Sequence, residues 1–315
     1  MISFVTLIIA TIVLIGIPCH CHSNYKSQRE YDIKAEKMQK LVRNILSQEI
    51  PSFFQASPGS PAHNRKGPAV FTSAINRNIR EDTARMFAGT LRTTGYTGDI
   101  VVGVDVNAQP TLVPELKKWG TIRYPIDTVE TKGDIPYYKF RHYEIPHSGP
   151  LGYSINVLRL YLYKWWSMMY DSDAMFLLAD YSDLFFQSNP FTYKPELWMP
   201  PKAQLSVFLE NFPQKMIYRC PSNAGWISTC YGDQVFEQIR RNIVSCSGTT
   251  MGTRDAILVY VSALLAVCNI CTAFIAGFLN HVVLCRVVCV LMLSIGIPDD
   301  PADGPIGALA RTRGS

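Results

Sequence analysis

The sequence predicts an α/β fold in which helices flank both faces of a central, mostly parallel sheet. Predicted strands and helices alternate between residues 69 and 127, which is the pattern of right-handed βαβ units. The five apolar residues Met175–Ala179 have the length and composition of a strand that is buried on both faces, as in a parallel sheet. A chain of 315 residues that is 48% hydrophobic is also long enough to bury a sizeable core.

An apolar helix is expected to precede this domain. Residues 2–17 carry no charge and a polar stretch follows them, which predicts a signal peptide or a signal anchor over residues 1–23. Residues 24–66 are predicted to form a stem and linker. Their first part is helix-prone, whereas residues 51–68 contain four prolines and two glycines, which is typical of a linker.

The main domain is expected over residues 67–255, and its first half consists of alternating strands and helices. The first helix is predicted over residues 80–94, because Ala84, Phe87, Ala88 and Leu91 fall on one helical face. The strands are expected at residues 69–75, 98–105 and 121–127, and a second helix at residues 112–119. This alternation predicts that the strands are parallel neighbours.

The second half begins with a strong helix signal over residues 154–170. Ser154 is a suitable N-cap, and apolar side chains recur at helical spacing from Leu158 to Met169, so this helix is expected to pack in the core. The buried strand at 175–179 follows, and residues 204–211 also have the composition of a strand.

Two carboxylates stand at the end of the apolar strand. Asp180 follows it directly and Asp183 comes three residues later, so both are expected at the carboxyl edge of the sheet, where open α/β folds bind ligands. Nearby carboxylates suit Mn²⁺ or Mg²⁺, which take oxygen ligands and often substrate phosphates. Helix capping and turn formation are the structural alternatives for these residues.

The residues around these carboxylates resemble a known motif. The run from Asp180 to Phe191 is similar to the D-x-x-D-x-x-F-Q-x-x-P-F pattern of a eukaryotic group of GT-A-type nucleotide-diphospho-sugar transferases, and it matches at Asp180, Asp183, Phe186, Gln187, Pro190 and Phe191. The resemblance implies a GT-A-like fold and transfer of a sugar from a nucleotide-sugar donor to a glycan, protein or lipid acceptor. It also implies that Asp180 and Asp183 bind Mn²⁺ or Mg²⁺ and the donor.

Further segments are similar to the same family. Residues 87–104 resemble its donor-binding half, and Arg159, Tyr163 and Trp166 fit the spacing of a helix that precedes the acidic strand. Within residues 219–233, Asn223, Gly225 and Trp226 match positions that help to shape the acceptor and sugar pocket, and Asn223 and Gly225 are taken as candidates for donor binding. A Pro/Asn/Gly loop without a binding role is the alternative for that segment.

The resemblance also extends to residues 245–260, where it implies a glycine-containing turn at the start of a helix. Ser247, Gly248 and Gly252 are its candidates, since backbone amides at such a turn can hold an anion. No catalytic base is assigned.

The C-terminal part departs from the family. Residues 256–279 form a run without any charge. This run is long enough to be a transmembrane helix. We therefore expect residues 256–297 to be an apolar tail, either transmembrane or divergent, that does not pack as the closing helices of the domain. Residues 298–315 are expected to be disordered.

These observations lead to two functional hypotheses. The first is a metal-dependent glycosyltransferase of the secretory pathway, in the Golgi or endoplasmic reticulum membrane with a luminal domain, or secreted if the N-terminal segment is cleaved. The second is an inactive, membrane-tethered homologue that acts as a binding or interaction protein. The net charge of +5 is spread without a basic stripe, which argues against nucleic acid as a partner.

Overall fold

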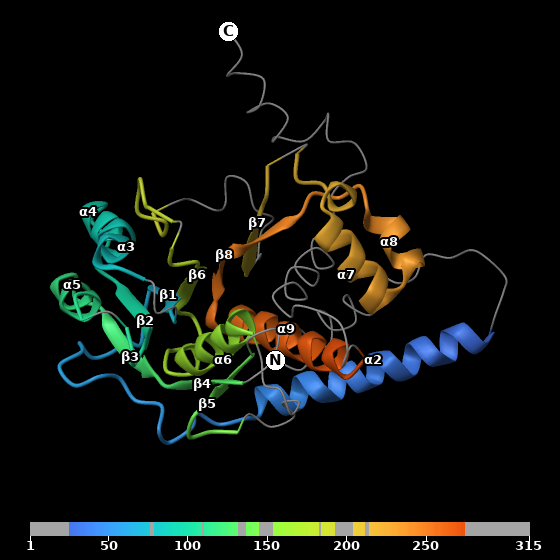
Figure 1. Cartoon of the computed structure of the whole chain (residues 1–315), viewed down its shortest axis with the longest axis horizontal. Helices are drawn as coiled ribbons and strands as arrows, with labels where there is room; N and C mark the ends of the chain where they lie inside the picture. Colours follow the sequence, from blue (N-terminus) through green and yellow to red (C-terminus); the bar gives the residue numbers. More distant parts are fainter. Residues whose placement is uncertain are drawn as a thin grey trace, which may run out of the picture.

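The computed structural model confirms the predicted α/β class, with a mostly parallel central sheet between two layers of helices (Figure 1). It describes residues 25–75, 79–108, 110–131, 137–144, 154–182, 184–192, 204–211 and 214–274. The N-terminal apolar segment, Asp183 and residues 275–315 lie outside the described residues. The predictions for the signal segment and for the disordered end therefore stay predictions.

Six strands form the central sheet in the order β3-β2-β1-β6-β8-β7. β1, β2, β3 and β6 are parallel neighbours, and β8 runs antiparallel between β6 and β7. Their bounds are Ala69–Ala74 for β1, Asp99–Asp105 for β2, Ile122–Ile126 for β3, Met175–Ala179 for β6, Leu205–Leu209 for β7 and Ser245–Thr253 for β8. Since β6 lies between β1 and β8, the residue that follows it stands near the middle of the sheet edge.

One face of the sheet is covered by the helices of the first half. The predicted helix at 80–94 is continuous but contains a π-helical turn, and its apolar face packs on β1 and β2 through Ala84, Phe87, Ala88 and Leu91, all fully buried. These helices are α3 (Glu81–Ala84), η1 (Arg85–Gly89), α4 (Thr90–Thr93) and α5 (Leu112–Lys118). The apolar face that the sequence predicts for this helix is therefore the face that is buried against the sheet.

The other face carries three longer helices: α2 (Tyr25–Leu46), α6 (Ile155–Ser167) and α9 (Arg254–Phe274). α6 lies against the sheet, and its Trp165 and Trp166 are almost completely buried in the largest apolar cluster. Fully burying a large apolar side chain stabilises the fold by roughly 1.5–3 kcal/mol. Trp166 packs against Phe71 of β1 and Tyr124 of β3, which anchors α6 on the sheet.

α9 corrects the expectation that the chain beyond residue 255 stays outside the domain. Its Ile257, Val261, Leu264 and Leu265 are buried in the same cluster as side chains of α6 and α2. The three helices lie side by side (Figure 1). A helix that is apolar on all sides must be covered, either by lipid or by protein. Here α6 and α2 cover the described part of α9. Composition alone does not show whether protein or lipid covers such a helix.

Among the helices in the described ranges, none is long and apolar enough to cross a membrane.

A smaller unit follows β7. It consists of η3 (Ile217–Arg219), α7 (Pro221–Tyr231) and α8 (Asp233–Ile239), packed around Ile217, Ile227 and Ile239. A loop was the expected alternative for residues 219–233, but the structure has a helix over most of them, begun by Pro221 at a position where proline is favourable. A two-stranded hairpin, β4 (Thr128–Thr131) with β5 (Tyr137–Phe140), lies near α6.

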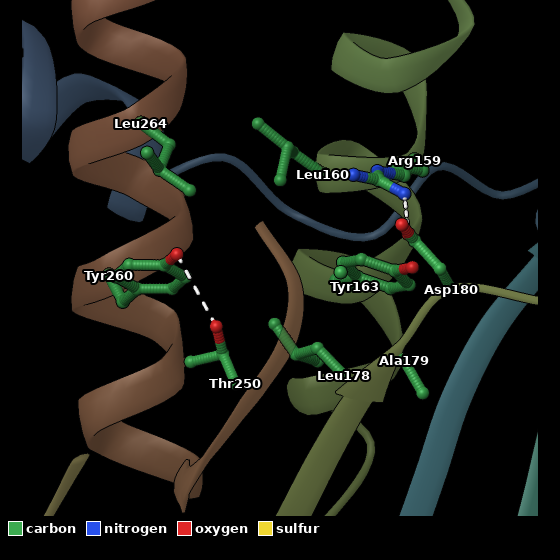
Figure 2. A pocket seen from close by; sticks show the side chains of 10 residues that line it. Arg159, Leu160, Tyr163, Leu178, Ala179, Asp180, Thr250, Tyr260 and Leu264 are labelled. Atoms are coloured by element: carbon green, nitrogen blue, oxygen red, sulfur yellow. Dashed lines mark hydrogen bonds and ion pairs between the residues drawn. The ribbon is translucent and has the colours of Figure 1, made fainter. Parts of the chain in front are cut away.

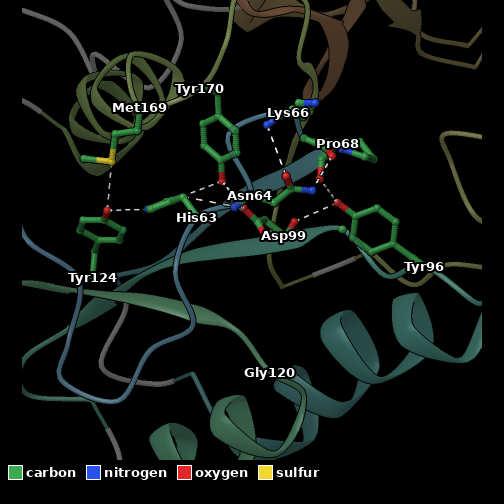
Figure 3. A network of polar contacts seen from close by, with 12 residues as sticks. His63, Asn64, Lys66, Pro68, Tyr96, Asp99, Gly120, Tyr124, Met169 and Tyr170 are labelled. Atoms are coloured by element: carbon green, nitrogen blue, oxygen red, sulfur yellow. Dashed lines mark hydrogen bonds and ion pairs between the residues drawn. The ribbon is translucent and has the colours of Figure 1, made fainter.

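A polar network closes the amino edge of the sheet (Figure 3). The His63 ring nitrogens lie 2.7 Å from the hydroxyls of Tyr170 and Tyr124, and the Tyr170 hydroxyl donates to Asp99 Oδ2 at 2.8 Å. The amide of Asn64 donates to the same oxygen at 2.8 Å. Burial lowers the pKa of His63, and the negative charge of Asp99 opposes this effect. The network thus ties residues 63–64 to the starts of the strands.

Candidate functional site

Asp180 lies at the opposite, carboxyl edge of the sheet, as predicted. It is the first residue after β6, and its amide donates to the carbonyl of Gly248 on β8 at 2.8 Å. Its side chain is 31% exposed, so the carboxylate is reachable from solvent. The described backbone therefore presents this carboxylate at the place where parallel sheets bind ligands.

Arg159 of α6 forms an ion pair and hydrogen bond with this carboxylate through Nη1 and Oδ1 (Figure 2). The Arg159 side chain is 14% exposed, about half as much as that of Asp180. An ion pair screened from water in this way is stronger than one on an open surface. The sequence signal for Arg159 was its loose match to the family spacing, with no role attached.

Gly248 leaves the space that the Asp180 carboxylate occupies. A Cβ atom at this position would lie 2.6 Å from Asp180 Oδ2 and 3.0 Å from its Cγ. The prediction of a glycine-containing turn at a helix start within residues 245–260 is wrong, because residues 245–253 form β8 and α9 begins only at Arg254. The backbone of this segment pairs with β6 and β7, so it does not form an anion-binding turn. Gly248 belongs to the site because the absence of a side chain there leaves room for the Asp180 carboxylate.

Gly252, the other described glycine of that segment, does not lie beside Asp180. It pairs with Phe176 near the start of β6, whereas Thr249 pairs with Ala179 at its end. Four residues of extended strand separate Gly252 from Gly248, roughly 13 Å at 3.3 Å per residue. The structure therefore does not bring these two candidates together.

Tyr163 lies one helical turn after Arg159 and faces the same site (Figure 2). The pKa of Tyr163 is raised to about 12, mainly by burial; the Arg159 charge and a hydrogen bond with the Ser73 side chain oppose this rise, and the Asp180 charge contributes to it. The phenol is therefore neutral at physiological pH and keeps its proton. Ser73 stands in β1, so this contact joins α6 to the central strands.

A small pocket opens beside these residues. Its lining includes the polar side chains of Arg159, Tyr163 and Asp180. Thr250 and Tyr260 also line it, and their hydroxyls form a hydrogen bond of 3.4 Å. The remaining lining residues are Leu160, Leu178, Ala179, Gly248 and Leu264. The cavity volume is about 20 Å³, which is enough for a single water molecule. A ligand larger than a water molecule does not fit inside this cavity.

The described residues fit a metal ion only in part. Asp180 supplies one carboxylate, of which one oxygen already contacts Arg159, and Asp183 lies outside the described residues. Within the part of the chain that the structure describes, no group of three His, Cys, Asp or Glu side chains could hold a metal. A hard cation that takes one or two carboxylates and completes its shell with phosphate and water would fit such a site.

Asn223 and Gly225 lie on α7, outside the pocket around Asp180. Asn223 is 1% exposed, and neither its amide oxygen nor its amide nitrogen has a hydrogen-bond partner among the described residues. Gly225 is exposed, with nothing within 4 Å of a Cβ placed there. The described structure thus does not place these two candidates with Asp180, and their role in donor binding stays a prediction.

Comparisons with known proteins give little further guidance. No protein-family model matches the chain, and no curated protein matches it. Among solved structures it is similar to the mannosyltransferase Ktr4p from S. cerevisiae, with 8% identity and a TM-score of 0.34, over 90% of this chain and 81% of that one. A likeness this slight does not assign an activity to this chain. The fold and the site define it as an α/β protein with a charged candidate ligand site at the carboxyl edge of its sheet.

Proposed function

We propose that the protein is a glycosyltransferase that uses a nucleotide-sugar donor and a divalent cation. The observation that carries this proposal is the setting of Asp180, which ends the central strand β6, contacts Arg159 and is kept clear of other side chains by Gly248. A reachable carboxylate beside a cation at this sheet edge suits a phosphate-containing ligand. The similarity of residues 180–191 to the acidic motif of GT-A-type transferases supports the same function.

In this proposal Asp180 and Asp183 bind Mn²⁺ or Mg²⁺. When bound, the cation would supply Lewis-acid stabilisation of the leaving diphosphate. The protein's own contribution is to hold the Asp180 carboxylate, through Arg159 and the backbone of β8, and to keep Tyr163 as a neutral hydrogen-bond donor beside it. The acceptor is a glycan, a protein or a lipid.

The test is calorimetric titration of the whole chain with UDP, GDP and their sugar conjugates, with Mn²⁺ and with chelator, followed by assay of nucleotide-sugar hydrolysis. We expect Mn²⁺-dependent binding that Asp180→Asn and Asp183→Ala abolish. Asp171→Asn is the matched control, because Asp171 pairs with Arg65 in an exposed ion pair of 3.2 Å remote from Asp180. Binding that survives both variants, or that does not depend on the metal, would overturn the assignment.

An inactive homologue that binds a nucleotide-sugar or a partner without turnover is the second candidate. The observation that favours it is the single carboxylate in the described lining of the pocket, which leaves no separate general base there. Nucleotide binding without hydrolysis or transfer would support this candidate. Turnover that is lost with Asp180→Asn would exclude it.

We also propose that the domain enters the secretory pathway behind its N-terminal apolar segment, as a luminal domain or a secreted one. Uncharged residues 2–17 support this. Translation in the presence of microsomes followed by protease treatment tests it. Digestion of residues 67–250 without detergent would show that the domain is not luminal.

A further inference from the structure

The first helix of the domain contains the π-helical turn η1. In a regular α-helix the amide of Thr90 would donate to the carbonyl of Met86, four residues earlier. Here the Thr90 amide donates to the carbonyls of Arg85 and Phe87 instead. The Thr90 hydroxyl donates to the Met86 carbonyl in place of the amide, and it lies 3.3 Å from the Phe87 carbonyl. Turns of this kind are rare and are frequently found at functional sites.

The Thr90 hydroxyl also bonds to the segment that follows Asp180. Its oxygen accepts a hydrogen bond of 3.0 Å from the backbone amide of Phe186, which lies 96 residues later in the chain. Because the single hydrogen of this hydroxyl is directed at carbonyls of its own helix, its oxygen offers only lone pairs, and these suit an amide donor. The π-helical turn therefore directs an acceptor at the chain beyond β6.

Phe87 of the same turn contacts this segment before and after Asp183 in the sequence. Its ring is fully buried, and its centroid lies 5.3 Å from that of Tyr181 and 5.3 Å from that of Phe186. Tyr181 is the residue after Asp180, whose own amide is bonded to β8. The backbone at Asp180 is thus held by β8 on one side and by the π-helical turn on the other.

These contacts explain the two phenylalanines of the acidic motif. Phe186 and Phe191 both pack against the apolar cluster of the first helix, and Phe191 stacks on Tyr96 with 5.5 Å between ring centroids. The described lining of the pocket beside Asp180 includes neither of them. Their contacts therefore dock the acidic segment, residues 180–191, onto the first helix.

We propose that Thr90 and Phe87 are positioning residues for the acidic segment and that they raise the affinity of the site for its divalent cation. This inference rests on the proposed function and adds two residues of a distant helix to it. Both residues act through the backbone that carries the Asp180 carboxylate. A divalent cation is bound well only when its ligands are held close to their required positions by supporting contacts.

The experiment measures the Mn²⁺ concentration that half-saturates binding of UDP or GDP to the whole chain. Thr90→Val keeps the shape of the side chain but offers no acceptor to the Phe186 amide. It should raise this concentration roughly fivefold, which is what one ordinary hydrogen bond represents. Thr90→Ser keeps the hydroxyl and should stay near wild type. Phe87→Leu removes the ring from both aromatic contacts and should act in the same direction as Thr90→Val.

Hydrogen exchange of the chain without Mn²⁺ or nucleotide tests the anchor by itself. In Thr90→Val the Phe186 amide should exchange several-fold faster, while amides of the central strand β2 keep their rates because the fold is intact. Thr94→Val is the matched control, since the Thr94 hydroxyl donates to the Leu91 carbonyl at 2.6 Å within the same helix. It should leave both measurements unchanged.

Faster exchange at Phe186 with an Mn²⁺ requirement within twofold of wild type would overturn the inference, because Thr90 would then only stabilise the loop. Unchanged exchange in Thr90→Val would overturn it too, as would a loss in Thr90→Ser equal to that in Thr90→Val. Each of these results leaves the proposed function intact. If the wild-type chain binds no nucleotide with Mn²⁺, the proposed function fails and this inference fails with it.

Discussion

The two edges of the central sheet both carry buried polar side chains, but they use them differently. At the amino edge, His63, Tyr124, Tyr170 and Asp99 bond to one another, and each contact joins two protein groups. At the carboxyl edge, Asp180 keeps 31% of its side chain exposed and Arg159 and Tyr163 face a pocket. Satisfied buried networks stabilise and specify a fold. The Asp180 carboxylate, which is partly exposed beside the pocket, can instead meet a ligand.

Helix α6 runs between the two edges of the sheet and carries two cationic side chains, Arg159 and Lys164, in different surroundings. Arg159 has the Asp180 carboxylate as its partner, whereas Lys164, five residues later and fully buried, donates to the backbone carbonyl of Gln48 at 2.8 Å. A carbonyl does not neutralise a charge, so Lys164 carries a desolvation cost that Arg159 largely avoids. The comparison predicts that changes at the amino edge and at Lys164 alter stability, and that changes at the carboxyl edge alter ligand binding.

The largest stability effect is expected for Asp99→Ala. It leaves the buried Tyr170 hydroxyl and the Asn64 amide without their acceptor, which should lower the free energy of unfolding by about 3 kcal/mol. Urea denaturation measures this, and nucleotide affinity should be unchanged. A loss of affinity with little loss of stability would break the contrast between the two edges.

Gly248→Ala should weaken binding, although less than Asp180→Asn, which is expected to abolish it. The new methyl group must displace the Asp180 carboxylate or β8, and overpacking of this kind costs about 1–3 kcal/mol. We expect Mn²⁺-dependent nucleotide affinity to fall roughly tenfold or more, which corresponds to about 1.4 kcal/mol. Titration calorimetry checks this, and unaltered affinity would show that the position of Asp180 does not matter to the ligand.

Lys164→Met should stabilise the protein at neutral pH by about 1–2 kcal/mol, after allowance for screening and for the lost hydrogen bond. Burial lowers the pKa of Lys164 from 10.5 to about 8. Between these values the unfolded chain binds more protons, so this group makes the wild-type protein more stable as the pH rises from 8 to 10.5.

The measurement is the difference in unfolding free energy between wild type and variant at pH 7 and at pH 10, since other groups cancel in the difference. The advantage of the variant should shrink at the higher pH. An advantage that is the same at both pH values would mean that Lys164 is not the group that titrates.

The smallest effect is expected for Gly225→Ala. Alanine at a helix position with nothing within 4 Å of its Cβ should raise stability by about 0.5–1 kcal/mol. If α7 has no part in the site, nucleotide affinity stays the same, and thermal melting together with titration shows both. Reduced affinity would instead support the predicted role of Gly225 in donor binding.

Local sequence patterns were sufficient for most of the fold. The strands β1, β2, β3 and β6 and the helices α5 and α6 lie within about two residues of their predicted ends, except that α6 ends at Ser167. Apolar periodicity and run length depend on residues close together in the chain, so they can be read without knowing the tertiary structure. The same is true of Asp180, whose place at the sheet edge follows from the strand that precedes it.

Tertiary structure alone decided the remaining features. The burial of α9 depends on α2 and α6, which lie far from it in the chain and end at Leu46 and Ser167, because an apolar run does not state what covers it. The contacts of Asp180 with Arg159 and Gly248 join three separate elements, and no local pattern contains them. The sequence by itself therefore determined the order of the elements and the carboxylate at the sheet edge. Packing between distant segments decided which side chains surround that carboxylate. A contact depends on where the fold places both partners, and the residues next to either partner in the chain do not contain that information.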